Sequence, residues 1–323
     1  MLKPCWSPDS YLCRDYLGNA VAVRRSLYDR LTEAEKKDMG ACHDRLVQLA
    51  GGFEKGCITI AHLTGILYHR HSLWPLPGKG RPGVRLEESG ADMSGIVGKP
   101  QAGQPEVSVV IPSKDNAKVL IRCLDTLCDT VKGLSYEIIL VDNGSGAQAR
   151  DMIEKEIGKL KNTEKYQRCL KGIQLIYQPM EFNFSRMCNM GAAASKGNFL
   201  LFLNDDIEAV DPGWLESMAE KAKEPWVGAV GYKLLYPDGE RIQHAGVTNI
   251  ILGPTHKLQH QLDSRIYYDG RNVGVWNMLA VTGACLLLRR EVFCEVEGFC
   301  EEMKVAFNDV DLLKYTRRAT TMW

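Results

Sequence analysis

The feature that most constrains the fold is an alternation of short apolar runs with amphipathic segments between residues 106 and 223. Continuous apolar strands that alternate with helices are typical of a parallel sheet covered by helices on both faces. The sequence therefore predicts an α/β fold with a doubly wound, mostly parallel sheet. The expected strands are 106–112, 136–142, 172–178 and 198–204, and the expected helices are 117–129, 147–160, 183–197 and 212–223.

Polar and acidic residues directly follow three of these expected strands. They are Ser113 and Asp115 after the first strand, Asp142 at the end of the second, and Asn204, Asp205 and Asp206 after the fourth. Because ligands of parallel sheets bind beyond the carboxyl ends of the strands, these residues form the floor of a predicted ligand site. Asp205 and Asp206 are adjacent like charges that are costly to desolvate. Either solvent at an ordinary strand end or a bound cation relieves their repulsion.

Two features divide the chain into parts. The stretch 76–104 is rich in glycine, proline and charge without a sustained apolar period, which predicts a linker. An internal repeat lies on both sides of it, because an apolar run, an Arg-Arg pair and a helix start follow both Gly18 and Gly283 at an offset of 265 residues. The predicted domains are 1–75 as the rear-half remnant of a first unit, 76–104 as the linker, and 105–323 as a second unit.

Composition and charge argue against several classes of protein. The 40 Lys and Arg residues balance the 40 Asp and Glu residues, and no basic block is present, so we expect no nucleic-acid partner. No apolar run approaches the length of a membrane-spanning helix, and the N-terminus lacks the apolar core of a secretory signal. The eleven cysteines are scattered without a C-x-x-C pair, which favours reduced thiols in a cytoplasm over a metal cage.

Six motifs occur in an order that resembles family 2 glycosyltransferases of the GT-A fold. They are VSVVIPSKD, YEIILVDNGS, FNFSRMCNMGAAASKGNFLLFLNDD, IQHAGV, VTGACLLLRREVFCEVEGF and AFNDVDL. The set is similar in particular to bacterial enzymes that build surface polysaccharides, some of which carry two transferase units in tandem. The resemblance covers most of 105–313 and implies a GT-A type sheet.

The resemblance implies that the strand ends bind a nucleoside diphosphate sugar and a divalent metal. Asp206 matches the metal ligand, and Mn²⁺ or Mg²⁺ there would neutralise charge on the leaving diphosphate. Asp142 matches the residue that recognises the base, although VDNGS is also rich in turn formers that bond their own backbone. The other implied nucleotide-sugar contacts are Pro112, Ser113, Asp115, Arg186, Asn189, Asn204 and Asp205.

Asp309 matches the family's general base, which takes the proton of the acceptor hydroxyl in an inverting transfer. The family usually has Glu before this Asp, whereas here the preceding residue is Asn308. An exposed charge or a helix cap is the alternative interpretation of Asp309. Thr282 and Gly283 resemble the wall on the acceptor side, and His244 is a further candidate there, although a lone histidine is usually structural.

These expectations describe an inverting, metal-dependent glycosyltransferase. It would move a sugar from a nucleoside diphosphate sugar to a growing surface polysaccharide or similar glycan, free or lipid-linked. Such a role implies a cytoplasmic location and peripheral association with the cytoplasmic face of the membrane. An unrelated nicotinamide-dependent oxidoreductase is not expected, because IPSKDNAK lacks the glycine-rich turn that would follow the first strand.

The sequence after Asp309 departs from the family. The family continues with a helix and then a strand that carries a Tyr-His pair, and KYTRRATTMW shows neither. We therefore expect the second unit to lack its C-terminal end. The alternative function is a catalytically impaired glycosyltransferase fragment that only binds a nucleotide sugar or a partner.

Overall fold

A computed structural model of the 323-residue chain describes residues 30–32, 63–64, 67–68, 104–250, 253–267, 270–314 and 319–322. The chain divides into two units, one of residues 1–76, 264–277 and 323, and the other of residues 77–263 and 278–322. The predicted first-unit remnant and linker lie almost entirely outside the described residues. Within the first unit, β1 (Leu63–Thr64) and β2 (Leu67–Tyr68) form an antiparallel pair.

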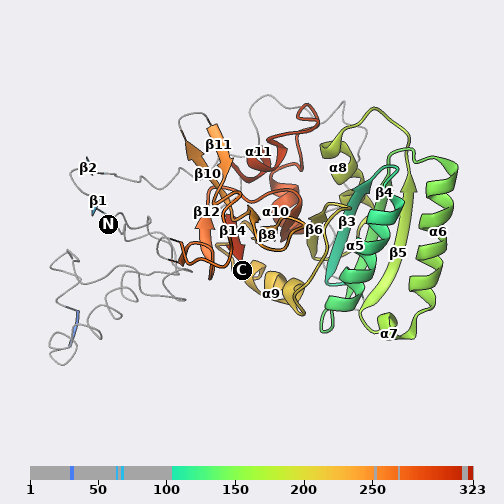
Figure 1. The fold of residues 1–323 in the computed structure, drawn as a ribbon, viewed down its shortest axis with the longest axis horizontal. Coiled ribbons are helices and arrows are strands. Elements are labelled where there is room, and N and C mark those ends of the chain that lie inside the picture. The colour runs from blue at the N-terminus through green and yellow to red at the C-terminus, as the bar shows by residue number, and fades with distance from the viewer. Residues whose placement is uncertain are drawn as a thin grey trace. The chain divides into compact units, whose positions relative to one another are not determined.

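A mostly parallel sheet is the centre of the second unit (Figure 1). Its strand order is β12-β14-β7-β13-β6-β3-β4-β5. Strands β6, β3, β4 and β5 run parallel, β13 is antiparallel to both β6 and β7, and β14 is parallel to β7. The strand bounds are β3 Val107–Ser113, β4 Tyr136–Asp142, β5 Leu170–Tyr177, β6 Phe199–Leu203, β7 Ala229–Tyr232, β12 Trp276–Met278, β13 Cys285–Arg289 and β14 Ala319–Met322.

Helices cover both faces of this sheet. Their bounds are α5 Ala117–Thr130, α6 Ala147–Asn162, α7 Glu164–Gln167, α8 Phe184–Ala194, α9 Trp214–Ala222, α10 Arg290–Glu295 and α11 Asn308–Lys314. Helices α5, α6 and α9 bury their apolar residues in one core cluster, and α8, α10 and α11 in a second cluster. Successive side chains of a strand point to opposite faces, so Val109 and Ile111 join the first cluster and Val110 the second. The predicted α/β class is confirmed.

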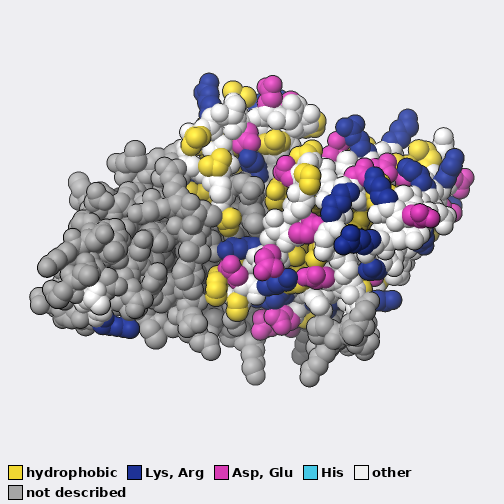
Figure 2. Space-filling model, turned by 90° about the horizontal axis from the view of Figure 1, so that it is seen from below, with side chains coloured by type: hydrophobic (Ala, Val, Ile, Leu, Met, Phe, Trp, Pro, Cys, Tyr) yellow, Lys and Arg dark blue, Asp and Glu magenta, His cyan; other side chains and the backbone are white. Residues whose placement is uncertain are grey.

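Two small antiparallel pairs lie beside the main sheet. Strand β8 (Leu234–Leu235) pairs with β9 (Ile242–His244), and β10 (Val247–Ile250) pairs with β11 (Gly253–His256). Among the described residues, no helix combines the length and the hydropathy that crossing a membrane requires. On the face seen in Figure 2, Lys and Arg side chains are interspersed with Asp and Glu.

The expected elements between 106 and 223 all form, with small shifts at their ends. The helix expected over 183–197 ends earlier, at Ala194. Three residues later, the backbone of Gly197 lies so close to β3 that an added Cβ would be 2.6 Å from the Ser108 backbone nitrogen. The chain is therefore already extended where it enters β6.

The sequence after Asp309 was expected to lack the family's helix and its Tyr-His strand, but a helix and a strand without that pair do form there. Helix α11 contains Asp309, and the residues ATTM form β14, which pairs with β7 from Ala319↔Ala229 to Met322↔Tyr232. Threonine favours strands because a β-branched side chain suits a pleated surface. The sheet therefore continues beyond β7 within the described residues.

Candidate functional site

Ser113 brings three strand ends together. It is the last residue of β3 and pairs in register with Asp142, the last residue of β4. Its hydroxyl donates a hydrogen bond of 2.7 Å to Oδ2 of Asp205, which follows β6. The candidate residues of three neighbouring strands thus meet at the carboxyl edge of the sheet. Pro112 precedes them as a buried residue of β3 that pairs with Val141.

The two adjacent carboxylates have different surroundings. Asp205 is partly buried, and this burial raises the pKa of its carboxyl group. The Ser113 hydrogen bond opposes the rise, while the charge of Asp206 adds to it. Asp206 itself is exposed. Beneath them, burial and the two carboxylates together raise the pKa of the Cys123 thiol, which donates to the Asn204 carbonyl at 3.7 Å.

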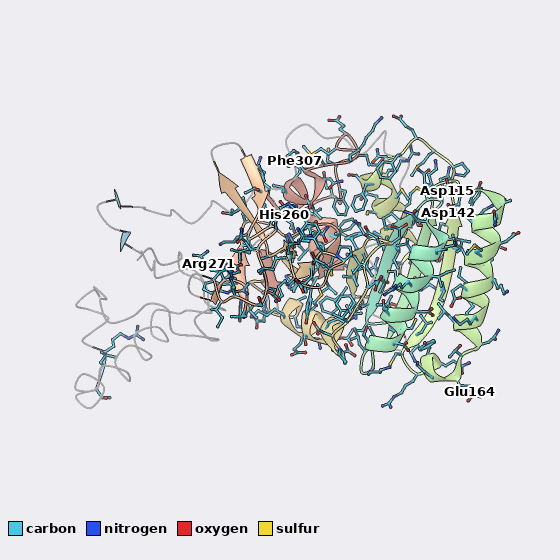
Figure 3. All side chains as sticks on the ribbon, in the orientation of Figure 1. Asp115, Asp142, Glu164, His260, Arg271 and Phe307 are labelled. Carbon is cyan, nitrogen blue, oxygen red and sulfur yellow. The ribbon has the colours of Figure 1, made fainter. Side chains whose placement is uncertain are left out.

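Asp142 and Asp115 hold the turns after β4 and β3. Oδ1 of Asp142 accepts the Ser145 N–H at 2.8 Å, and the Asp115 N–H donates to the Ser145 hydroxyl at 2.8 Å. Asp115 has a φ of 56°, a conformation that aspartate tolerates better than most residues. Figure 3 shows Asp115 and Asp142 at the same end of the molecule. Asp142 therefore forms the turn that VDNGS indicated, and Asp115 is bonded to the same turn.

The second carboxylate oxygen of Asp142 differs from the first. Asp142 is 1% exposed, and its Oδ2 is buried with no hydrogen-bond partner among the described residues. A buried carboxylate oxygen without a donor is energetically costly. The N–H of a bound base is one group that could satisfy it.

Asp309 is held by backbone amides from two directions. Its Oδ2 accepts the Gly283 N–H at 2.9 Å, and its Oδ1 accepts the Val310 N–H at 2.7 Å. The side chain of Asn308 accepts the Asp309 N–H at 2.9 Å and donates to the Ser185 hydroxyl at 3.3 Å. The residue before Asp309 therefore anchors it to α8, and the carboxylate is oriented and partly buried.

His244 lies behind the Thr282–Gly283 turn and not on its surface. Its side chain is fully buried, and its Nε2 accepts the N–H groups of Gly246 and Thr282 at 3.2 and 3.3 Å. Nδ1 therefore carries the proton and donates to Nδ1 of His256 at 2.9 Å. Burial, together with the nearby charge of His256, lowers the pKa of His244 to about 3. These contacts favour a structural role for His244. It holds the Thr282 N–H in place, and the next amide of the turn, that of Gly283, donates to Asp309.

Two further candidates, Arg186 and Asn189, belong to α8. Arg186 is exposed, and its backbone N–H donates to the Asn183 side chain that caps the helix. Asn189 is 2% exposed and bonds Phe299 twice, at 2.9 and 3.0 Å, and Glu301 once, at 3.0 Å. Its amide is thus engaged in holding the 299–301 segment, which favours a structural role.

Sequence reasoning missed Ser145 and Ser185, which support Asp142 and Asn308. Ser145 belongs to the VDNGS turn motif, so the sequence did contain a signal for its hydrogen bond with the Asp115 backbone. Ser185 had no such signal, because its contact with Asn308 joins residues 123 positions apart.

Carboxylate chemistry at the edge of the sheet suits a hard divalent cation. Magnesium commonly binds one or two carboxylates together with substrate phosphates. The described residues contain no group of three His, Cys, Asp or Glu side chains arranged as a complete metal cage. The Asp205–Asp206 pair therefore fits a divalent cation that substrate phosphates also help to bind. The like charges of the two carboxylates disfavour each other, which a bound cation would relieve.

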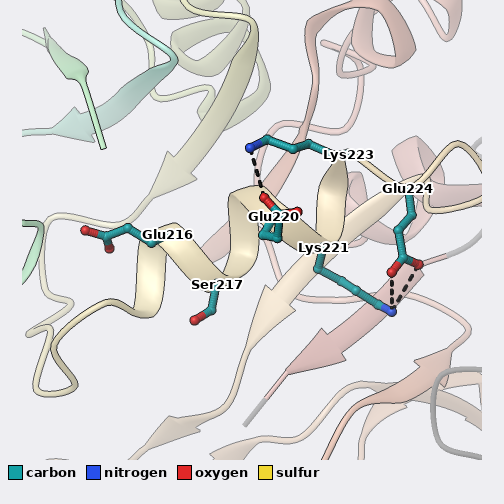
Figure 4. Close-up of a pocket in the computed structure, with 6 residues that line it drawn as sticks. All are labelled: Glu216, Ser217, Glu220, Lys221, Lys223 and Glu224. Carbon is teal, nitrogen blue, oxygen red and sulfur yellow. Dashed lines mark hydrogen bonds and ion pairs between the residues drawn. The ribbon is translucent and has the colours of Figure 1, made fainter. Parts of the chain in front are cut away.

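A depression lined by residues of α9 and by Lys223 and Glu224 after it is a separate feature (Figure 4). Its lysines pair with glutamates of the same helix region, Lys223 with Glu220 at 2.9 Å and Lys221 with Glu224 at 3.1 Å. None of the candidate residues lines it. It adds nothing to the site at the strand ends.

The fold and the edge define an α/β protein with carboxylates at the ends of its parallel strands. The model of the family described as "Glycosyl transferase family 2" matches residues 108–296, more than half of the chain. The chain belongs to glycosyl transferase family 2. Its fold is of the α/β class that the motifs implied, and the family that its sequence matches is one of glycosyltransferases.

Two curated relatives are similar over much of the chain. O-antigen biosynthesis protein RfbC of Myxococcus xanthus is 33% identical over 337 residues, which cover 96% of this chain and 25% of RfbC. The uncharacterized protein y4gI of Sinorhizobium fredii (strain NBRC 101917 / NGR234) is 38% identical over 228 residues, 68% of this chain and 23% of y4gI. The chain spans about a quarter of the length of these relatives.

Two solved structures are similar to the chain at low sequence identity. The mannosyltransferase PcManGT from Pyrobaculum calidifontis, in complex with GDP-Man and Mn²⁺, is 14% identical with a TM-score of 0.46, covering 66% of this chain and 52% of its own. GalNAc-T7 with UDP, GalNAc and Mn²⁺ is 14% identical with a TM-score of 0.49, covering 69% and 44%.

Proposed function

We propose that the second unit is an inverting glycosyltransferase that moves a sugar from a nucleoside diphosphate sugar to a hydroxyl of a surface polysaccharide or similar glycan. The observation that carries the proposal is the convergence at Ser113, which joins the end of β3 to Asp142 in register and to Asp205 by a hydrogen bond. The name of the Myxococcus relative, an O-antigen biosynthesis protein, supports the acceptor class. We propose that the transfer takes place at the cytoplasmic face of a membrane, with peripheral association of the protein, because a lipid-linked glycan is one form of this acceptor.

The donor would bind along the carboxyl edge of the sheet. A pyrimidine N–H would donate to the buried, unpartnered Oδ2 of Asp142, with Asp115 beside the same turn. The Ser113 hydrogen bond holds Asp205 toward β3, while Asp206 is exposed and available as a ligand of Mn²⁺ or Mg²⁺. When bound, that ion supplies positive charge opposite the diphosphate leaving group.

Asp309 would act on the acceptor. The acceptor hydroxyl oxygen forms a bond to the anomeric carbon, and its proton passes to the Asp309 carboxylate. The bond between that carbon and the diphosphate oxygen breaks, and its electron pair leaves with the diphosphate. The amides of Gly283 and Val310 orient the carboxylate for this proton transfer, and Thr282 stands next to it as the acceptor-side wall.

A thermal-shift screen of nucleotide sugars with and without Mn²⁺ tests the proposal. We expect one donor to raise the Tm of the wild-type protein and of Asp309→Asn, and we expect a smaller shift for Asp206→Asn. Transfer of the sugar should fall by at least about a hundredfold in Asp309→Asn, as loss of a general base predicts. Wild-type activity in Asp309→Asn would contradict the assignment of the base. Donor binding without turnover by the wild-type chain would instead support the impaired fragment.

A further inference from the structure

The loop of residues 302–307, which leads into Asp309, exposes apolar side chains. Val305 is 69% exposed, Phe307 is 58% exposed, and Met303 is also exposed. Single exposed apolar residues are common on protein surfaces, so exposure alone assigns no role. The position of this loop, directly before the proposed base, is what sets it apart.

The 302–307 loop is tied to the start of α8. The Ser185 hydroxyl donates to the Met303 carbonyl at 2.7 Å, and the Phe184 N–H donates to the Lys304 carbonyl at 2.8 Å. The Lys304 ammonium also pairs with Glu181 at 3.0 Å. These contacts fix the path of the backbone, so the fold itself directs the apolar side chains outward.

Phe307 adopts a backbone conformation that is unfavourable for its residue type. Its φ is 61°, in the left-handed region, where a bulky side chain is a genuine outlier. Its carbonyl accepts the Asp311 N–H at 2.8 Å, which places it at the start of α11 and two residues before Asp309. Glycine or asparagine would adopt this conformation more easily. Strain of this kind is concentrated at functional sites. Because the ring is exposed, packing does not offset the strain.

We propose that the ring of Phe307 binds the acceptor, by stacking against the apolar C–H face of a pyranose ring whose hydroxyl points to Asp309. The inference rests on the proposed function, because it places the acceptor at Asp309. An aromatic ring has a negative face that attracts the weakly positive C–H groups on one side of a sugar. Figure 3 shows Phe307 in the same upper part of the molecule as Asp115 and Asp142.

The charges around Phe307 favour a sugar over a membrane surface. Exposed Glu302 precedes the ring, Asp309 and Asp311 follow it, and Lys304 is already paired with Glu181. An anionic bilayer would repel this acidic surrounding. A glycan offers hydroxyl donors to the carboxylates and a C–H face to the ring, so it matches both parts of the surface.

A matched set of variants tests the inference. Phe307→Gly removes the ring and also relieves the backbone strain, so we expect an unchanged or higher Tm and an unchanged thermal shift with the donor. Saturation-transfer NMR with methyl β-D-galactopyranoside and methyl α-L-rhamnopyranoside then reports acceptor binding. We expect the signal of at least one glycoside to fall about tenfold or more in Phe307→Gly, to persist in Phe307→Tyr, and to be unchanged in Val305→Ser.

Several outcomes would overturn the inference. An equal glycoside signal in Phe307→Gly, an equal loss in Val305→Ser, or no signal in the wild-type protein would each do so. Binding of anionic phosphatidylglycerol vesicles that is lost in Phe307→Gly would assign the ring to a membrane instead. Absence of a thermal shift with every donor would contradict the proposed function itself, which is a distinguishable result.

Discussion

Neighbouring residues of the chain have different tasks at the carboxyl edge of the sheet. Asp205 is turned toward β3 by the Ser113 hydroxyl, whereas Asp206 is exposed. The same division holds at the Thr282–Gly283 turn, where one amide donates to His244 and the next donates to Asp309. In each pair one group is held toward the interior, and the other is exposed or bonded to the proposed base.

Replacing Ser113 with Ala should weaken the site more than the fold. The loss of one hydrogen bond to a carboxylate should reduce the free energy of unfolding by about 1–2 kcal/mol. Without that bond Asp205 is no longer fixed toward β3, so we expect donor affinity with Mn²⁺ to fall roughly tenfold, about 1.4 kcal/mol. Titration calorimetry with the donor from the thermal-shift screen measures this change.

Ser108→Ala is the matched control for that variant. Ser108 lies in the same strand, away from the carboxyl edge, and its hydroxyl bonds Glu137 at 2.6 Å and the Gly197 N–H at 2.7 Å. It should lower stability and leave donor affinity unchanged. Equal affinity losses in both variants would show that Ser113 acts only through the fold.

At the scale of the elements, the Arg-Arg pair of the repeat motif joins two helices to the sheet. Arg289, at the end of β13, donates to the carbonyls of Ala222 and Glu224 at the end of α9, at 2.5 and 3.0 Å. Arg290 is buried and donates to the Gly197 carbonyl at 2.6 Å and the Ser195 hydroxyl at 2.9 Å, after α8. Cations at helix C-termini satisfy carbonyls that have no partner within the helix. The motif that indicated a repeat therefore has a structural role here.

Two glycines in helices should respond in opposite directions to substitution by alanine. A Cβ at Gly191 in α8 would lie 2.2 Å from Cγ1 of Val110, whereas a Cβ at Gly158 in α6 meets nothing within 4 Å. We expect Gly191→Ala to reduce the free energy of unfolding by about 1–3 kcal/mol through overpacking. Gly158→Ala should increase it by up to about 1 kcal/mol through helix propensity.

Denaturant unfolding of the two variants measures both changes under identical conditions. Stabilisation by Gly191→Ala would mean that α8 and β3 have room to separate. The close approach of this helix and strand at Gly191 would then not limit the size of the side chain.

On the scale of the whole molecule, the part of the fold that the sequence predicts is the part with local signals. The strands from β3 to β6 are continuous apolar runs with helices between them, so their type and order were readable. The antiparallel placement of β13 between β6 and β7 depends on pairing between distant segments, which no local pattern encodes. The bond from Ser113 to Asp205 spans 92 residues, and the burial of His244 depends on three separate segments. Such contacts exist only once the sheet has formed.

Global stability should fall as the pH is lowered through the range below about 6.5. His244 has a pKa of about 3 in the folded protein, whereas an unfolded histidine titrates near 6.5, so the unfolded state binds the additional proton. The contribution of neutral His244 to the free energy of unfolding is complete above about pH 6.5 and is lost progressively toward pH 3. The free energy of unfolding then changes by up to about 1.4 kcal/mol per pH unit.

Urea unfolding between pH 7.5 and 5 measures this slope before most carboxylates titrate. His244→Gln is the control, since it cannot gain a proton. We expect it to be less stable at pH 7.5 and to show a smaller slope. An identical slope in both proteins would assign the pH dependence to other groups.

The order of the site residues along the chain has a consequence for protein synthesis. Ser113 and Asp142 end two parallel strands and Asp206 follows a third, which is complete at Leu203, while Asp309 is 103 residues further along than Asp206. At about 5–20 residues per second, a ribosome needs roughly 5–20 s to make that interval. The nascent chain therefore carries the proposed donor-binding edge for several seconds before its proposed base exists. During that time a bound nucleotide sugar could stabilise the half-made sheet without being consumed.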